Sequence, residues 1–130
     1  TDAGSNAAFG GRYPTATLYV TRDFMTKNPE TVQRLVNAFI RTLKWIDVST
    51  PETIADKMPK EQQVGGRDVF VDALRHSKPI FSKDGLMTDA DAKVALTVLS
   101  SYDEKIRNAK IELSKTYTNR FVDQALKTVK

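Results

Sequence analysis

The pattern of hydrophobic positions predicts an amphipathic helix over residues 29–47, the most distinct element of the chain. Its start is marked by Asn28, a good capping residue, with Pro29 at the first helical position and Glu30 in the first turn. Apolar residues then recur at helical spacing and form one wide stripe: Val32, Leu35, Val36, Phe39, Ile40, Leu43 and Ile46. Polar residues fall on the opposite face: Gln33, Arg34, Asn37, Arg41 and Lys44.

Four further amphipathic helices are predicted. The first opens at Thr50-Pro51 and ends at Pro59, and the second follows Gly65-Gly66 and ends before Pro79. The third spans about residues 89–107, where Thr88 and Asp91 form a capping box with Asp in place of the preferred Glu. The last helix takes Thr118 as its cap. The residues expected to be buried are Val32, Leu35, Val36, Phe39, Leu43, Val98, Leu99, Phe121 and Leu126.

One segment, residues 15–21, has the β-branched and aromatic composition of a strand. A lone strand leaves its backbone groups unpaired, so we expect this segment to pair with a strand of another chain or of a missing part of this protein. The residues before it, 1–14, are small, polar and rich in glycine, and they predict a linker or hinge loop. The chain opens on Thr1 and reads as a piece of something longer.

Composition and charge exclude several classes of protein. No stretch approaches the roughly 18–20 apolar residues of a transmembrane helix. The absence of Cys removes disulfides, thiolate nucleophiles and Cys-based zinc sites, and a lone His76 removes two-histidine metal sites. The net charge is +4, but the basic residues are scattered among acids and form no stripe. We therefore expect no metal, no cofactor and no nucleic-acid partner.

The candidates for chemistry are few, and no catalytic residue is assigned. His76 lies at the C-terminal end of a short helix, where the helix dipole favours a cation. Asp89 and Asp91 lie in the first turn of a helix, where the dipole favours acidic side chains. Arg12 follows Gly10-Gly11, a pair that either exposes backbone N–H groups to an anion or serves as a flexible joint. The nearby hydroxyls of the 15–21 segment point either to a ligand or to solvent.

Three groups of residues carry a family resemblance over nearly the whole chain from about residue 9. The run Tyr13-Pro-Thr-Ala-Thr-Leu-Tyr-Val-Thr-Arg-Asp-Phe24 precedes Lys27-Asn28-Pro29-Glu30 and an amphipathic helix that ends in Trp45. Later come Phe81-Ser-Lys-Asp-Gly-Leu-Met87 and Lys115-Thr-Tyr-Thr-Asn-Arg-Phe-Val122. Together these resemble the C-terminal part of nitrate/taurine/sulfonate-type ABC-transporter substrate-binding proteins, which are related to thiamine-precursor binders.

The resemblance implies a fold and a function. The fold class would be mostly α with one or two strands, a C-terminal fragment of an α/β type II periplasmic-binding fold. Residues 1–14 would be the hinge loop, and residues 15–130 a hinge strand plus the helical part of one lobe. The protein would be a non-enzymatic, extracytoplasmic component of an ABC importer that captures a small, anionic ligand. The hinge-proximal candidates for ligand binding are Arg12, Tyr13 and Thr15.

The same resemblance implies partners and leaves two alternatives. The partners would be a small-molecule ligand, a membrane permease, and either the missing N-terminal half of the same protein or a strand-pairing copy of this chain. The location would be periplasmic or extracytoplasmic, with membrane association through the transporter. One alternative is an enzyme or enzyme fragment similar to thiamine-pyrimidine synthases, and another is a helical interaction domain without a ligand.

Overall fold

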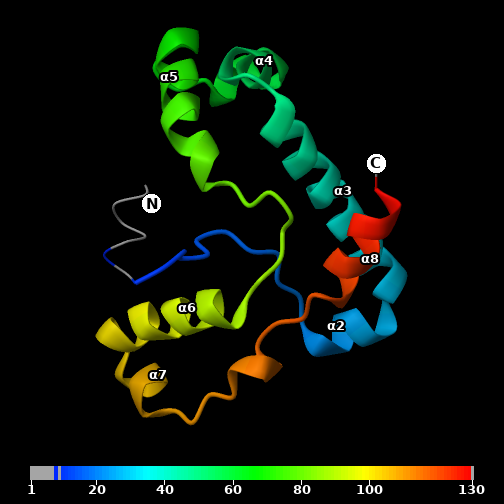
Figure 1. Ribbon diagram of the computed structural model, residues 1–130, viewed down its shortest axis with the longest axis vertical. Helices are drawn as coiled ribbons and strands as arrows, with labels where there is room; N and C mark the ends of the chain where they lie inside the picture. Colours follow the sequence, from blue (N-terminus) through cyan, green and yellow to red (C-terminus); the bar gives the residue numbers. More distant parts are fainter. Residues whose placement is uncertain (1–7, 9, 130) are drawn as a thin grey trace.

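The regular structure of the described residues is helical throughout. The computed structural model describes residue 8 and residues 10–129. The elements are α2 (Arg22–Lys27), α3 (Pro29–Val48), α4 (Pro51–Lys57), η1 (Lys60–Gln62), α5 (Arg67–Ser77), η2 (Lys78–Ile80), α6 (Asp89–Tyr102), α7 (Glu104–Asn108), η3 (Leu113–Lys115) and α8 (Arg120–Thr128). Figure 1 shows α2, α3 and α8 together on one side, α4 and α5 beyond the end of α3, and α6 with α7 on the other side.

The packing of α3 against α8 forms a hydrophobic core. Ile40, Ala125 and Val129 are buried at its centre, and four half-buried residues surround them: Val36, Leu43, Val122 and Leu126. Two polar contacts hold α8 along α3. The Gln33 side chain donates to the Phe121 carbonyl at 2.8 Å, and the Lys44 ammonium donates to the Val129 carbonyl at 2.6 Å.

Gly85 lies directly against this core. Its φ is +73°, and a Cβ built there would lie 2.6 Å from Ile40 Cδ1. Only glycine combines a positive φ with no side chain to displace Ile40. The loop that links η2 to α6 therefore passes closer to the core than another residue would permit.

A second helical pair, α4 and α5, follows the C-terminal end of α3. Thr50 caps α4 by accepting the Thr53 N–H at 3.2 Å. Beyond α5, the Lys78 ammonium reaches back and donates to the Asp47 and Ser49 carbonyls at 3.0 and 2.7 Å. Carbonyls at the end of a helix lack partners within it, so this lysine satisfies the end of α3 and fixes the pair to it.

The helix predicted over residues 89–107 is interrupted at Asp103. The Asp103 carboxylate accepts the N–H groups of Lys105 and Ile106 at 2.9 and 3.3 Å, and it caps α7 as a separate helix. A short acidic side chain can accept nearby backbone N–H groups in place of the carbonyls that would accept them in a continuous helix. The last helix also differs from expectation, because its N-cap is Asn119 rather than Thr118.

The expected fold class is wrong. The chain is an all-helical domain with no strand among its described residues, rather than a mostly α chain with one or two strands cut from an α/β type II periplasmic-binding fold. The 15–21 segment is irregular, and in the described part of the chain Pro14–Val20 makes no backbone hydrogen bond. Strand composition is not enough, because a ladder needs a second strand. Residues 1–7 and 9 of the expected linker lie outside the described residues.

The expected core is confirmed only in part. Val32 and Phe121 are buried, whereas Leu35 and Phe39 are 41% and 54% exposed, so their predicted burial is wrong. The other expected core residues are half-buried: Val36, Leu43, Val98, Leu99 and Leu126. The cause is geometric, because α8 covers only the side of α3 that carries Val36 and Ile40. No described helix is long and apolar enough to cross a membrane.

Two adjacent residues of α3 test this arrangement. Ile40 is 2% exposed, so Ile40→Ala should lower the free energy of unfolding by about 2–5 kcal/mol through the cavity it leaves. Phe39→Ala should cost about 1 kcal/mol or less, because its ring is already in contact with water. Urea unfolding of the two variants measures both losses. Equal losses would show that Phe39 packs in the interior.

Candidate functional site

The candidate site is built on Asp91, at the start of α6. The Thr88 hydroxyl accepts the Asp91 N–H at 3.1 Å, and the Asp91 carboxylate accepts the Thr88 N–H at 2.9 Å. The predicted capping box is therefore confirmed, with Asp at the position that Glu usually takes. The shorter side chain keeps its carboxylate close to the helix end, where Asp91 is only 5% exposed. A buried carboxylate needs further partners to offset its lost hydration.

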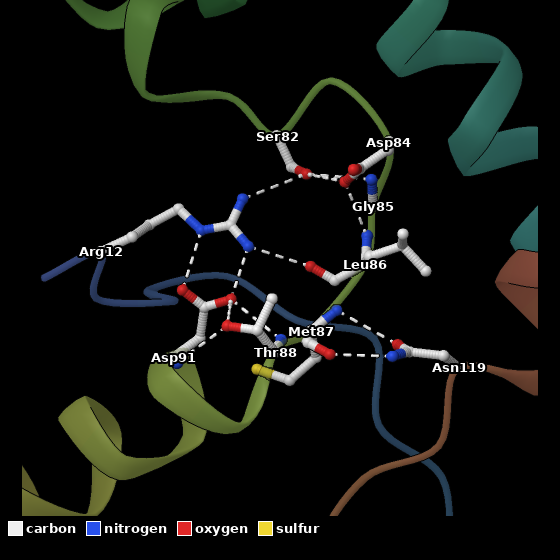
Figure 2. A network of polar contacts seen from close by, with 9 residues as sticks. All are labelled: Arg12, Ser82, Asp84, Gly85, Leu86, Met87, Thr88, Asp91 and Asn119. Carbon is white, nitrogen blue, oxygen red and sulfur yellow. Dashed lines mark hydrogen bonds and ion pairs between the residues drawn. The ribbon is translucent and has the colours of Figure 1, made fainter.

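Arg12 supplies the strongest of those partners (Figure 2). Its Nε donates to Asp91 Oδ1 at 3.0 Å and its Nη2 to Asp91 Oδ2 at 2.5 Å, which is the two-pronged pairing of a guanidinium with a carboxylate. Nη2 also donates to the Leu86 carbonyl at 3.0 Å. Nη1 lies 3.5 Å from the Ser82 hydroxyl oxygen. The Arg12 side chain remains 41% exposed.

The ion pair strongly favours the ionised form of Asp91. The hydrogen bonds from Arg12 lower the pKa of Asp91 to about 2, and those from Thr88 add to this, whereas burial acts in the opposite direction. The pKa of Arg12 is raised, chiefly by its hydrogen bond to Asp91. Both groups are therefore charged at neutral pH.

The loop between η2 and α6 is ordered by its own polar groups. The Ser82 hydroxyl accepts the Gly85 N–H at 2.9 Å and donates to Asp84 Oδ1 at 3.1 Å. The same Asp84 oxygen accepts the Leu86 N–H at 2.9 Å. This turn presents the Leu86 carbonyl to Arg12, as Figure 2 shows.

Asn119 connects this loop to α8. Its amide oxygen accepts the Met87 N–H at 3.1 Å, and its amide nitrogen donates to the Met87 carbonyl at 2.8 Å. One side chain thus satisfies both backbone groups of Met87, as a neighbouring strand would do. Arg12 and Asn119 together join the N-terminal segment, α6 and α8 through a single loop.

A hollow of about 290 Å³ opens beside the ion pair. The turn Gly10–Arg12 forms one wall, and α6 forms the other with Asp91, Lys93 and Thr97. Gly11 comes close to α6, where a Cβ would lie 3.2 Å from Val94. We call this space the Arg12 hollow. Its cationic groups are Arg12 and Lys93.

A second, wider hollow of about 540 Å³ lies between the N-terminal ends of α3 and α8, beside Arg34 and Arg120. Gln33 also lines it, and the Gln33 side-chain oxygen is buried with no hydrogen-bond partner among the described residues. That oxygen is a hydrogen-bond acceptor and is buried away from solvent. An acceptor offers nothing to an anion, and Arg34 and Arg120 are engaged by Glu30 and by the Phe121 ring. We therefore take the Arg12 hollow as the candidate site.

The structure places the three predicted ligand-binding residues in different settings. Arg12 is paired with Asp91, and Tyr13 next to it is half-buried. Thr15 is exposed and makes no hydrogen bond to another described residue. From the sequence, Asp91 was predicted only as a helix-capping residue. The local signal of its second role, the pairing with Arg12, was an Asp at a position where Glu is the better capping residue.

The other candidate groups have local partners. The Asp89 carboxylate accepts the Tyr117 hydroxyl at 2.5 Å, so it is engaged outside the pair of Arg12 with Asp91. His76 is exposed at the end of α5, with a ring nitrogen 2.8 Å from the Asp72 carbonyl. Within the described part of the chain, no group of three His, Asp or Glu side chains is arranged to hold a metal ion.

The Asp91 ion pair predicts a specific dependence of stability on pH. Because the folded pKa of about 2 lies below the ordinary value of 3.8, the pair should contribute about 2 kcal/mol above about pH 4 and lose it as the pH falls towards 2. Urea unfolding of the parent and of Asp91→Asn measures this, since other carboxylates cancel in the difference. That difference should shrink over this interval. A constant difference would show that Asp91 is not held ionised by Arg12.

Comparisons with known proteins give one structural relative. No family model matches the sequence, and no curated protein matches it. A solved structure of a protein from Bordetella bronchiseptica RB50 superposes with a TM-score of 0.87 and 31% sequence identity over 94% of this chain. The chain spans 38% of the length of that protein. This chain is therefore similar, over almost all of its length, to a minor part of a larger protein.

Proposed function

We propose that this chain is part of an extracytoplasmic solute-binding protein of an ABC importer, which captures a small anion and delivers it to a membrane permease. The resemblance of residues 13–45, 81–87 and 115–122 to nitrate/taurine/sulfonate-type binding proteins supports this function. The role is one of binding and release, without a chemical reaction.

The observation that carries the proposal is the set of donors that Arg12 retains. A guanidinium has five N–H donors, and Asp91 and Leu86 take three of them. The remaining two are on Nη1, whose contact with Ser82 is long, at 3.5 Å. Asp91 thus holds the guanidinium in one orientation while leaving the Nη1 amino group for a carboxylate, sulfonate or nitrate.

Arg12 cannot bind such an anion strongly by charge alone, because Asp91 neutralises it. Affinity then depends on several directed donors that close around the ligand and exclude water. We assign supporting roles to the hydroxyls of Tyr13 and Thr15, which follow Arg12 in the chain. The other donors would come from further polypeptide, in keeping with a relative of which this chain covers 38%.

The irregular segment after Arg12 supports an assembly of this kind. Among the described residues, Pro14–Val20 has no backbone partner, and Tyr19 is 89% exposed. Backbone groups without partners and an exposed aromatic ring are features that further polypeptide would cover.

Isothermal calorimetry with nitrate, taurine and small carboxylates tests the function. The 130-residue chain should bind them weakly or not at all, and the full product of the gene should bind one of them tightly. In that full product, Arg12→Lys should weaken binding by about 1.5–3 kcal/mol, because Lys keeps the charge and loses the planar set of donors.

The matched control is Asn119→Ala in the full product. It removes the two bonds to Met87 and loosens the same loop, but it leaves every Arg12 donor in place. Its affinity for the anion should stay near that of the parent. Equal losses from the two variants would make the role of Arg12 purely structural. Tight binding by the 130-residue chain alone, or no anion binding by the full product, would contradict the proposed function and favour an interaction domain.

A further inference from the structure

A second apolar face of α3 is only partly covered by the described residues. Leu35, Phe39 and Trp45 are 41%, 54% and 37% exposed, and Ala38 and Thr42 are exposed between them. The Thr42 hydroxyl donates to the Ala38 carbonyl at 2.9 Å, so its polar atom is satisfied within the helix. We call these five residues, which recur at a spacing of three or four, the outer stripe.

The outer stripe lies beside the face that packs on α8 and widens the apolar surface of α3. The polar side of the helix carries Gln33, Arg34, Asn37, Arg41 and Lys44. A surface helix that packs on one neighbour needs one apolar stripe, and a wider apolar surface is typical of a helix that is buried on more than one side. Among the described residues, α3 packs on α8 and also contacts α2. The outer stripe nevertheless stays partly exposed, so α3 has apolar surface for a further neighbour.

The size of the structural relative indicates what the other neighbour is. That protein matches 94% of this chain with only 38% of its own length, so most of its polypeptide lies outside the match. A segment of the same polypeptide is present at a high effective concentration. It can cover an apolar face without the affinity that a second copy or a separate protein would need.

We infer that the outer stripe is the packing surface for a further part of the same polypeptide, outside these 130 residues. The inference rests on the part of the proposed function that places this chain in a longer protein, and it does not depend on the solute. Packing here would bury the exposed Phe39 ring and fix α3 between α8 and the added segment.

Site-specific photocross-linking in the full product of the gene tests this inference. Phe39→p-benzoylphenylalanine places the reactive group in the outer stripe, and Leu35→p-benzoylphenylalanine serves if the first variant does not fold. The matched control is Arg41→p-benzoylphenylalanine on the polar side of the same helix. After irradiation of the purified protein, mass spectrometry identifies the joined peptides.

With p-benzoylphenylalanine at residue 39 or 35, intramolecular products should join α3 to peptides outside the 130 residues. The control variant with this residue at position 41 should not give these products. Cross-linked dimers, products with another protein, the same products from residue 41, or no product at all would overturn the inference. The measurement needs no ligand, so it is separate from the calorimetry. Anion binding without these cross-links would reject only the packing surface proposed for the outer stripe. Cross-links without anion binding would reject only the proposed binding of an anion.

Discussion

The ion pair of Arg12 with Asp91 joins the N-terminal segment to the first turn of α6, across 79 positions of the sequence. Asp91 is buried at the first turn of α6, and its carboxylate is compensated there by Thr88 and by the Arg12 guanidinium. The same guanidinium binds the Leu86 carbonyl, so the N-terminal segment, the loop and α6 meet at one side chain. Removing one partner of such a pair is costly, because the other charge stays buried without compensation. Asn119 extends the connection to α8 through Met87.

This arrangement gives Arg12 two demands to meet. As a structural residue it must keep Asp91 neutralised, and under the proposed function it must also present donors to an anion. The geometry separates the two by atom, since Nε and Nη2 contact the protein while Nη1 is only weakly engaged. A guanidinium that is oriented in advance loses little freedom on binding, which offsets part of the attraction that Asp91 removes. Recognition at such a site depends on direction more than on net charge.

The surface of the molecule is consistent with a chain that works inside a larger protein. The outer stripe of α3 and the segment Pro14–Val20 both expose groups that folded proteins usually cover: aromatic rings in one case and backbone hydrogen-bonding groups in the other. In the structural relative, the match covers 38% of the chain, so this helical arrangement occurs there within a longer polypeptide.

Local sequence determined where the main helices begin. Pro29 and Pro51 start α3 and α4 as predicted, and the Thr88 capping box starts α6, because each signal acts on backbone groups within four residues. Tertiary structure decided which faces are covered and which charges meet. The wide stripe of α3 did not reveal that α8 covers only one side of it, and Arg12 and Asp91 are 79 residues apart. The 15–21 segment had the composition of a strand but no second strand to pair with. Burial, pairing and sheet formation all depend on distant partners, and only the folded chain brings those together.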